Sequence, residues 1–472
     1  MRGPGDILLV ACYELGHQPL AVAWPAAFLE SRGYTPAVMD VSVEPFDAER
    51  VRRACLVAIS VPMHTALRLG TTVARRVRQI NPAAHVCFFG LYATLNADYL
   101  LSHGADSVLG GEVEGALVEL VERLEREAGA GATVSGASLR PHQSGATPPL
   151  MHAPRLEKLS FPVPSRAKLP ALKEYAHLER EGRRELVGYV EASRGCRHLC
   201  RHCPIPPVYG GRFFVVPAEV VLADVRQLVG AGARHVTFGD PDFLNGPRHA
   251  MTVARALHQE FPDLTFDFTA KVEHLLRHRA LLPELAALGA IFVVSAVESL
   301  SDTVLANLAK GHTRADVTTV LGAVRAAGIA FRPTWVPFTP WATLEDYREL
   351  LAFIADEGLI DHVDAVQYSI RLLVPPGSLL LDSLAMRPHL GPLVEDGFYY
   401  RWTHPDPRVD QLQEAVGRTV AEAADRREDP AVTFARIRAL ADATAGLAAR
   451  PAPPPPASDR VRPPRLTEPW FC

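Results

Sequence analysis

The sequence predicts an α/β protein with two successive parallel sheets, the first doubly wound and the second curled into a partial or complete barrel. Short apolar runs alternate with amphipathic helical segments along most of the 472 residues. A Gly/Ser/Ala/Pro-rich stretch without periodicity separates two such series, and a proline-rich stretch follows the second. Alternation of this kind is typical of βαβ units, whose strands pair in parallel.

The first series occupies residues 1–128 and predicts a Rossmann-like domain. Strands are expected at the apolar runs, and helices at the amphipathic segments between them. The expected strands are 6–12, 35–42, 54–61, 85–90 and a run beginning at 105. Ligands of such sheets bind beyond the carboxyl ends of the strands.

The second series predicts six βα units, which suit a barrel whose functional groups lie on the loops after the strands. We assign 129–184 to a linker, 185–385 to the barrel, 386–449 to a helical extension and 450–472 to a proline-rich spacer with a terminal cysteine tail. The expected barrel strands are 186–192, 234–239, 264–270, 290–297, 329–336 and 363–370.

Composition sets limits on the partners of the chain. The formal net charge of −4 gives no general attraction to nucleic acid or acidic lipid. The sequence shows no secretion signal and no membrane-spanning apolar run. Seven irregularly spaced cysteines argue for reduced thiols, and Cys12, Cys55 and Cys87 are expected to be inert core thiols. These features predict a cytoplasmic protein without a nucleic-acid or membrane partner.

The remaining cysteine motif predicts a metal centre. Cys196, Cys200 and Cys203 form CxxxCxxC directly after the first expected barrel strand. Thiolates at this density select zinc or iron–sulfur. A structural zinc site needs a fourth ligand, which His198 or His202 could supply. Three thiolates on a [4Fe–4S] cluster leave one iron free for another ligand.

This motif and its place after the first barrel strand resemble the radical S-adenosylmethionine (SAM) superfamily. The resemblance implies an enzyme with a (β/α)6 partial TIM barrel, in which the three cysteines hold a [4Fe–4S] cluster. It also implies that the open iron binds SAM and that reductive cleavage of SAM gives a 5′-deoxyadenosyl radical. A flavodoxin- or ferredoxin-like electron donor is therefore expected. The substrate, a small molecule or a peptide, stays undefined.

The resemblance implies SAM contacts on two loops. Gly239, Asp240 and Asp242 follow the second strand, where the family contacts the SAM amino group. The alternative for this loop is a turn with an Asx cap. Glu298 and Ser299 follow the fourth strand, where they would lie near the ribose or the methionine part of SAM. The alternative for Ser299 is a helix cap.

Charged residues on the other strands complete the expected site. Arg332 on the fifth strand is a candidate for the SAM carboxylate, with a structural ion pair as the alternative. Lys271, Glu273 and His274 end the third strand and are expected to line the cavity. Lys310, which ends a helix, is expected to interact with helix carbonyls.

The N-terminal domain resembles the cobalamin-binding domains that precede some radical SAM barrels. "ADSVLGGEVEGAL", beginning at residue 105, is similar to the glycine turn and helix at the end of such domains. The DxHxxG motif that supplies an axial histidine is missing, because His17 lacks the preceding aspartate. Cobalamin is therefore a possible cofactor, and a purely structural Rossmann-like domain is the alternative.

The C-terminal "LTEPWFC", which ends at Cys472, resembles the CUAEP/CCAEP-tail radical SAM family. Chains of that family end in a Cys–Cys or Cys–selenocysteine pair followed by Ala-Glu-Pro. The resemblance implies a candidate selenoprotein in which the codon after Cys472 is UGA, and it makes Cys472 a candidate catalytic residue of a redox tail. The alternative is a frayed terminus with an incidental cysteine.

Two other functions compete with this interpretation. A zinc-binding interaction protein would hold zinc and would not cleave SAM. An RNA methylthiotransferase is disfavoured, because the sequence shows neither a basic RNA-binding appendix nor the cysteines of a second cluster.

Overall fold

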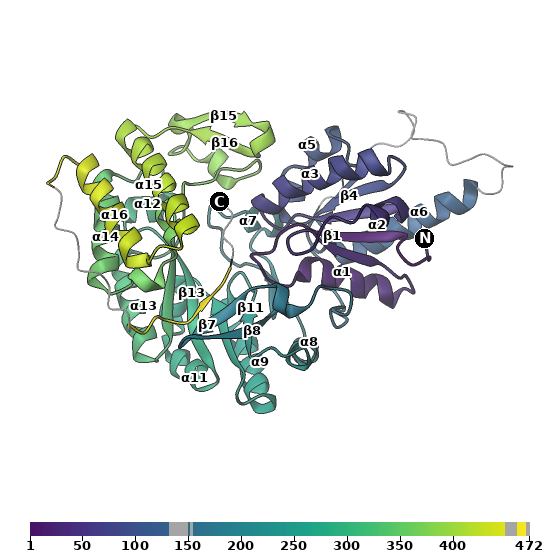
Figure 1. Ribbon diagram of the computed structural model, residues 1–472, viewed down its shortest axis with the longest axis horizontal. Coiled ribbons are helices and arrows are strands. Elements are labelled where there is room, and N and C mark those ends of the chain that lie inside the picture. Colours follow the sequence, from purple (N-terminus) through teal and green to yellow (C-terminus); the bar gives the residue numbers. More distant parts are fainter. Residues whose placement is uncertain (132–149, 152–153, 449–459, 469–472) are drawn as a thin grey trace.

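The computed structural model describes residues 1–131, 150–151, 154–448 and 460–468. Two α/β bodies lie side by side, the N-terminal domain and the barrel that follows it (Figure 1). The helices are α1 Leu20–Ser31, α2 Ala48–Arg53, α3 His64–Ile80, α4 Leu91–Leu95, α5 Ala97–Ser102, α6 Val113–Gly131, α7 Ile205–Tyr209, α8 Ala218–Gly230, α9 Pro247–Glu260, α10 Val272–Arg277, α11 Leu282–Ala287, α12 Asp302–Asn307, α13 Arg314–Ala326, α14 Leu344–Asp356, α15 Pro407–Arg426 and α16 Pro430–Thr444.

The N-terminal domain is a parallel sheet with helices on both faces, as predicted. Its strand order is β2-β1-β3-β4-β5-β6. Alternate residues of β1 enter different cores: Leu9 packs with α1 and α6, whereas Val10 packs with α2, α3 and α5. The strands are β1 Ile7–Ala11, β2 Ala37–Asp40, β3 Leu56–Ser60, β4 His85–Phe89, β5 Ser107–Leu109 and β6 Leu150–Met151.

The segment predicted as a linker contributes strands to both sheets. β6 pairs in parallel with β5 at the edge of the N-terminal sheet. β7 pairs antiparallel with β8 and extends the barrel sheet. Two-residue strands such as β6 are too short to show hydrophobic periodicity, and the sequence therefore gave no sign of it.

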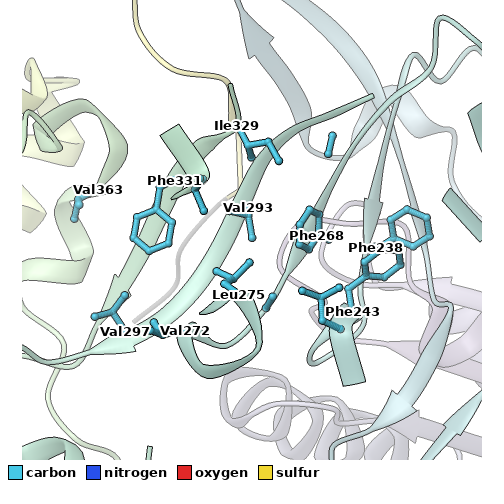
Figure 2. Packing of buried hydrophobic residues seen from close by; sticks show 14 of the residues in the cluster. Phe238, Phe243, Phe268, Val272, Leu275, Val293, Val297, Ile329, Phe331 and Val363 are labelled. Atoms are coloured by element: carbon cyan, nitrogen blue, oxygen red, sulfur yellow. The ribbon is translucent and has the colours of Figure 1, made fainter. Parts of the chain in front are cut away.

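The barrel sheet has seven strands in the order β14-β13-β12-β11-β8-β7-β17. Helices α8, α9, α11 and α13 cover its outside, and Phe238, Phe268, Val293 and Phe331 belong to the core of this domain (Figure 2). The strands of this part of the chain are β7 His177–Arg180, β8 Arg183–Val190, β9 Ser193–Gly195, β10 Phe213–Val215, β11 His235–Phe238, β12 Thr265–Thr269, β13 Ala290–Glu298, β14 Ala330–Trp335, β15 Leu390–Val394, β16 Tyr399–Trp402 and β17 Arg465–Leu466.

The sixth predicted barrel strand, 363–370, is wrong. The chain there forms a 3₁₀ helix, Ala365–Tyr368. The side-chain oxygen of Gln367 accepts the backbone N–H of Trp335 at 2.9 Å, so a side chain takes the place of a ladder partner. The parallel part of the sheet therefore ends at β14, and the barrel is open on that side.

The C-terminal extension packs beside the barrel and also contacts the N-terminal domain, so it joins the two domains. α15 and α16 form an antiparallel pair beside the barrel, but the predicted helical extension, 386–449, is α-helical only from Pro407, because the β15–β16 hairpin precedes α15. The β15–β16 hairpin reaches the N-terminal domain and inserts Phe398, 2% exposed, among its core residues. Beside it, His64 Nε2 lies 2.7 Å from the carbonyl oxygen of Gly397.

The chain then returns to the barrel. β17 pairs antiparallel with β7 at the edge of the sheet (Figure 1), with Leu466 opposite Leu178. Thr467 binds His177 through two hydrogen bonds of 2.9 Å. Within the described residues, no helix is both long and apolar enough to cross a bilayer.

Candidate functional site

The three motif cysteines lie on one loop after β9. Gly195 precedes this loop with a φ of +74°, and a Cβ there would meet the carbonyl oxygen of Arg212 at 2.5 Å. Only glycine satisfies both conditions. Cys196 and Cys200 are buried, and the backbone N–H of Cys203 binds the carbonyl of Cys200 at 3.2 Å.

The chemistry of these thiols fits a metal cluster. All three are free of disulfides. Burial, together with the nearby thiols of Cys200 and Cys196, raises the pKa of Cys203 to about 12. Thiols grouped in this way need cationic ligands to become thiolates, and iron supplies that charge. The donor set therefore fits a [4Fe–4S] cluster with three protein ligands.

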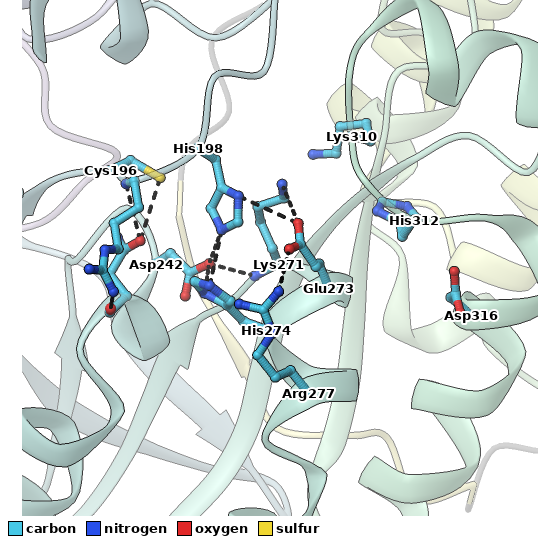
Figure 3. A network of polar contacts seen from close by, with 12 residues as sticks. Cys196, His198, Asp242, Lys271, Glu273, His274, Arg277, Lys310, His312 and Asp316 are labelled. Carbon is cyan, nitrogen blue, oxygen red and sulfur yellow. Dashed lines mark hydrogen bonds and ion pairs between the residues drawn. The ribbon is translucent and has the colours of Figure 1, made fainter. Parts of the chain in front are cut away.

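Asp242 connects this loop to the ends of two barrel strands (Figure 3). Its side chain is fully buried and accepts the backbone N–H groups of Leu244 and Lys271. One carboxylate oxygen lies 2.8 Å from His274 Nδ1 and 3.9 Å from His198 Nε2. Asp242, His198 and His274 could also hold a metal ion, because one ligand atom of each lies within 4.8 Å of the others.

His198 lies between two of the cysteines and enters a charged cluster. Its Nε2 is 3.2 Å from His274 Nε2, and its Nδ1 is 3.5 Å from Glu273. Burial lowers the pKa of His198 to about 4, and the ammonium of Lys271 adds to the effect. Lys271 itself lies 3.4 Å from Glu273. The ends of β11 and β12 therefore present polar groups to the cysteine loop. Lys271, Glu273 and His274 were expected to line the cavity, but they belong to the lining of neither the barrel cavity nor the cavity between the domains.

Glu298 forms a second polar contact beside the cysteine loop. Its carboxylate lies 3.2 Å from both Lys310 Nζ and His202 Nε2. Burial opposes its ionisation, but the charge of Lys310 and the bond from His202 outweigh burial and lower its pKa to about 2. The expectation that Lys310 interacts with helix carbonyls is wrong, because its buried ammonium binds Glu298. Ser299 accepts the backbone N–H of Ser301, the residue that precedes α12.

Gly239 and Asp240 support neighbouring elements. A Cβ at Gly239 would meet the Tyr189 hydroxyl at 2.3 Å, so the glycine admits the tyrosine ring. Asp240 accepts from the backbone of Ala192 and from the hydroxyl of Ser193, which fixes the start of β9. Burial raises the pKa of Asp240 to about 7. No part of these contacts requires a ligand.

The barrel encloses a cavity of about 250 Å³. Arg332 lines it, donates to Asp364 at 2.9 Å and reaches the Pro464 carbonyl at 3.5 Å. This arrangement is the structural ion pair that the sequence allowed as an alternative for Arg332. The sequence missed Asp267 on β12, which also lines the cavity. An aspartate between two phenylalanines of a buried strand was the signal that could have revealed it.

The C-terminal segment forms part of the same cavity wall. Leu466 and Glu468 line it together with His17 and Tyr189. Glu468 lies 2.8 Å from His17 Nε2, and the His17 ring stacks on Tyr189 with centroids 4.4 Å apart. Cys472 lies outside the described residues.

A second cavity, of about 290 Å³, lies between the two domains. Residues at or after the carboxyl ends of β1, β3, β4 and β5 line it, namely Glu14, Ser60, Gly90 and Gly111. The opposite wall belongs to the barrel and the cysteine loop, and it includes Tyr189, Gly195 and Gly239. This is the edge where ligands of doubly wound sheets bind.

The lining of this second cavity contains polar groups without partners. Ser60 Oγ and one carboxylate oxygen of Glu114 are buried and make no hydrogen bond to any residue that the structure describes. Arg194 of β9 binds Glu112, Glu114 and Glu191 at 2.6–3.0 Å and joins the two domains. Unpaired donors and acceptors of this kind fit a ligand with many amide groups, as cobalamin has.

The two cavities adjoin. Tyr189, Gly239 and Pro241 line both of them. His17 lines only the barrel cavity, where it binds Glu468. A ligand in the interdomain cavity would therefore not have His17 beside it, which agrees with the missing axial-histidine motif.

Family models match both domains. The radical SAM superfamily model matches residues 190–354, and the B12 binding domain model matches residues 7–121. The first match spans all three motif cysteines, and the second ends inside α6.

Curated relatives match only part of the chain. The ribosomal protein uS12 methylthiotransferase RimO of Porphyromonas gingivalis (strain W83) is 28% identical over 204 residues, which are 38% of this chain and 44% of the relative. The tRNA-2-methylthio-N(6)-dimethylallyladenosine synthase of Pseudomonas fluorescens (strain Pf0-1) is 25% identical over 262 residues, 50% of this chain and 55% of the relative. The chain thus spans about half the length of these relatives.

Solved structures share the arrangement of both domains. The cobalamin-dependent SAM radical enzyme OxsB superposes with a TM-score of 0.67 at 14% identity, covering 91% of this chain and 72% of OxsB. The radical SAM methyltransferase TsrM of Kitasatospora setae gives 0.57 at 18% identity, covering 74% of this chain and 71% of TsrM. The narrower resemblance to the CUAEP/CCAEP-tail family stays a prediction. The chain therefore contains a radical SAM domain at residues 190–354, and a B12 binding domain precedes it at residues 7–121.

Proposed function

We propose that this enzyme uses cobalamin together with SAM to modify a small substrate in the barrel cavity. The observation that carries the proposal is the adjoining pair of cavities, which share Tyr189, Gly239 and Pro241. The cluster and SAM would supply a 5′-deoxyadenosyl radical, and cobalamin would supply a transferable methyl group. The substrate cavity then lies next to the cobalamin cavity, as methyl transfer requires.

The residues of the chain would position these cofactors. Cys196, Cys200 and Cys203 would hold the cluster. Glu298 and Lys310 would keep their charges in place beside it, and Asp242 would orient His274 and His198. Four further residues would shape the SAM and substrate sites indirectly, through the contacts that they make with neighbouring elements. They are Gly239, Asp240, Ser299 and Arg332. A flavodoxin- or ferredoxin-like protein would supply the electron.

The experiment is anaerobic reconstitution followed by EPR of the dithionite-reduced protein with and without SAM. A [4Fe–4S] signal that SAM perturbs, together with 5′-deoxyadenosine, would support the proposal. Stoichiometric cobalamin in the purified complex would support the second cofactor. Bound zinc, or a cluster that SAM does not affect, would contradict it. A matched control is Cys55→Ser, since Cys55 is exposed on the N-terminal domain, contrary to the expectation of a core thiol, and should not alter the signal.

A second candidate is methylthio transfer, which the curated relatives favour. The arrangement of the other cysteines speaks against a second cluster of the kind such enzymes need. Cys12 follows the carboxyl end of β1, whereas Cys55 precedes the amino end of β3, so the two lie at opposite edges of the sheet. Iron analysis distinguishes the candidates, because about four iron atoms per chain fit one cluster and about eight fit two.

We also propose that Cys472 acts as a redox tail. The described segment that precedes it supports this, since Leu466 and Glu468 line the barrel cavity. Cys472→Ser should leave the cluster signal unchanged and abolish turnover. Sequencing the codons after Cys472 tests the selenocysteine hypothesis, and a UAA or UAG stop there would contradict it.

A further inference from the structure

The barrel cavity contains a buried carboxylate with one oxygen free. Asp267 is 2% exposed and lines the cavity. Its Oδ1 accepts from Thr237 Oγ1 at 2.6 Å and lies 2.8 Å from His235 Nε2. Within the described residues, no hydrogen bond reaches Oδ2. Oδ2 retains some exposure and faces the cavity, where a hydrogen-bond donor of a ligand can reach it.

His235 and its hydrogen-bond partners hold the Asp267 side chain in place. His235 is completely buried, and its Nδ1 lies 2.8 Å from Thr265 Oγ1. The histidine ring is therefore fixed at both nitrogens and cannot turn away from Asp267. No lysine or arginine in the described part of the chain pairs with Asp267. Oδ2 thus has a defined position at the cavity surface, with no resident cation opposite it.

Carboxyl groups outnumber cations in the cavity lining. Arg332 is the single lysine or arginine of the lining, and Asp364 on the same wall already neutralises it. Gln367, 3% exposed, uses its Oε1 to accept the Trp335 N–H, and no described residue accepts from its Nε2. The carboxyl groups of the lining are Asp240, Asp267, Asp364 and Glu468.

We propose that the cavity binds a small molecule that carries a protonated amine at one end and a hydrogen-bond acceptor at the other. The amine forms an ion pair with Oδ2 of Asp267, and the acceptor receives a hydrogen bond from Nε2 of Gln367. These residues lie on β12 and on the 3₁₀ helix after β14, so they face the ligand from different walls. The proposal rests on the proposed function, because it defines the substrate class of the same cavity.

Three small probes test this selectivity on the reconstituted, SAM-saturated protein. They are 4-aminobutanamide, butanamide and n-butylamine, which carry both groups, the acceptor alone and the amine alone. Saturation with SAM keeps the probes out of the SAM site. Dissociation constants come from the rise of the thermal midpoint with probe concentration. We expect 4-aminobutanamide to bind at least tenfold more tightly than butanamide and several-fold more tightly than n-butylamine.

The variant Asp267→Asn tests the location. We expect it to reduce the preference for 4-aminobutanamide over butanamide to less than threefold. The matched control is Asp263→Asn, four residues earlier and exposed, which should keep the wild-type preference. Equal binding of the two amides by the wild type would overturn the proposal without relying on any variant, and so would an unchanged preference in a folded Asp267→Asn protein. Absence of 5′-deoxyadenosine would instead contradict the proposed function and leave the probe result standing.

Discussion

Replacing Lys310 by methionine should destabilise the barrel strongly, because it leaves the Glu298 carboxylate buried without its cation. Glu298 is 6% exposed, and its pKa falls from the ordinary 4.5 to about 2. At about 1.4 kcal/mol for each tenfold change in acidity, ionised Glu298 is stabilised by roughly 3 kcal/mol. Measured losses on breaking a buried ion pair, about 3–5 kcal/mol, agree with this value.

The assay is the thermal midpoint of the barrel transition in reconstituted protein at pH 7. A loss of about 3 kcal/mol in a domain of this size lowers the midpoint by roughly 6–12 °C. The double variant Glu298→Gln/Lys310→Met removes both charges and should recover at least half of the loss.

Arg255→Met is the matched control, since the Arg255–Glu284 pair has side chains that are 57% and 41% exposed. Exposed pairs contribute less than about 1 kcal/mol, so this midpoint should hardly move. The reasoning is refuted if Lys310→Met lowers the midpoint no more than Arg255→Met, or if the double variant is no more stable than Lys310→Met alone.

Three further changes test other parts of the structure. Phe398→Ala should lower the free energy of unfolding by about 3–5 kcal/mol, because it removes the buried ring that joins the hairpin to the N-terminal domain. Calorimetry should then resolve two unfolding transitions instead of one. Burial, aided by Glu191, raises the pKa of Glu14 to about 8, so its contribution to stability is full below pH 4.5 and is lost as the pH rises through 8. Between pH 6 and pH 9, the thermal midpoint of Glu14→Gln should therefore fall less than the midpoint of the wild type. Parallel plots of midpoint against pH for the two proteins would contradict this. Cys203→Ser should reduce bound iron at least threefold with little change in far-ultraviolet circular dichroism, and wild-type iron content would exclude Cys203 as a ligand.

The sequence predicted most strands because strands buried on both faces appear as continuous apolar runs. The same rule failed at 363–370, where an apolar run forms a 3₁₀ helix and the Gln367 side chain replaces a backbone partner. Composition cannot distinguish these outcomes in a run of eight residues.

The cysteine loop could be predicted because its spacing is local. The pairing of Glu298 with Lys310 could not, since two separate segments must fold before the charges meet. The contact of His17 with Glu468 joins residues 451 positions apart, and neither residue type signals it. Asp267 lay within a predicted strand, but only the folded barrel shows that one of its oxygens faces the cavity without a partner among the described residues.

The pairing of β17 with β7 has a consequence for synthesis of the chain. Arg465 meets Glu179 across 286 positions, so the ribosome completes the whole barrel before this partner exists. At about 5–20 residues per second, the edge of β7 stays uncovered for roughly 15–60 s. Unpaired strand edges invite pairing with other chains. During the same interval Leu466 and Glu468 are missing from the cavity wall, so that side of the barrel cavity stays open to solvent.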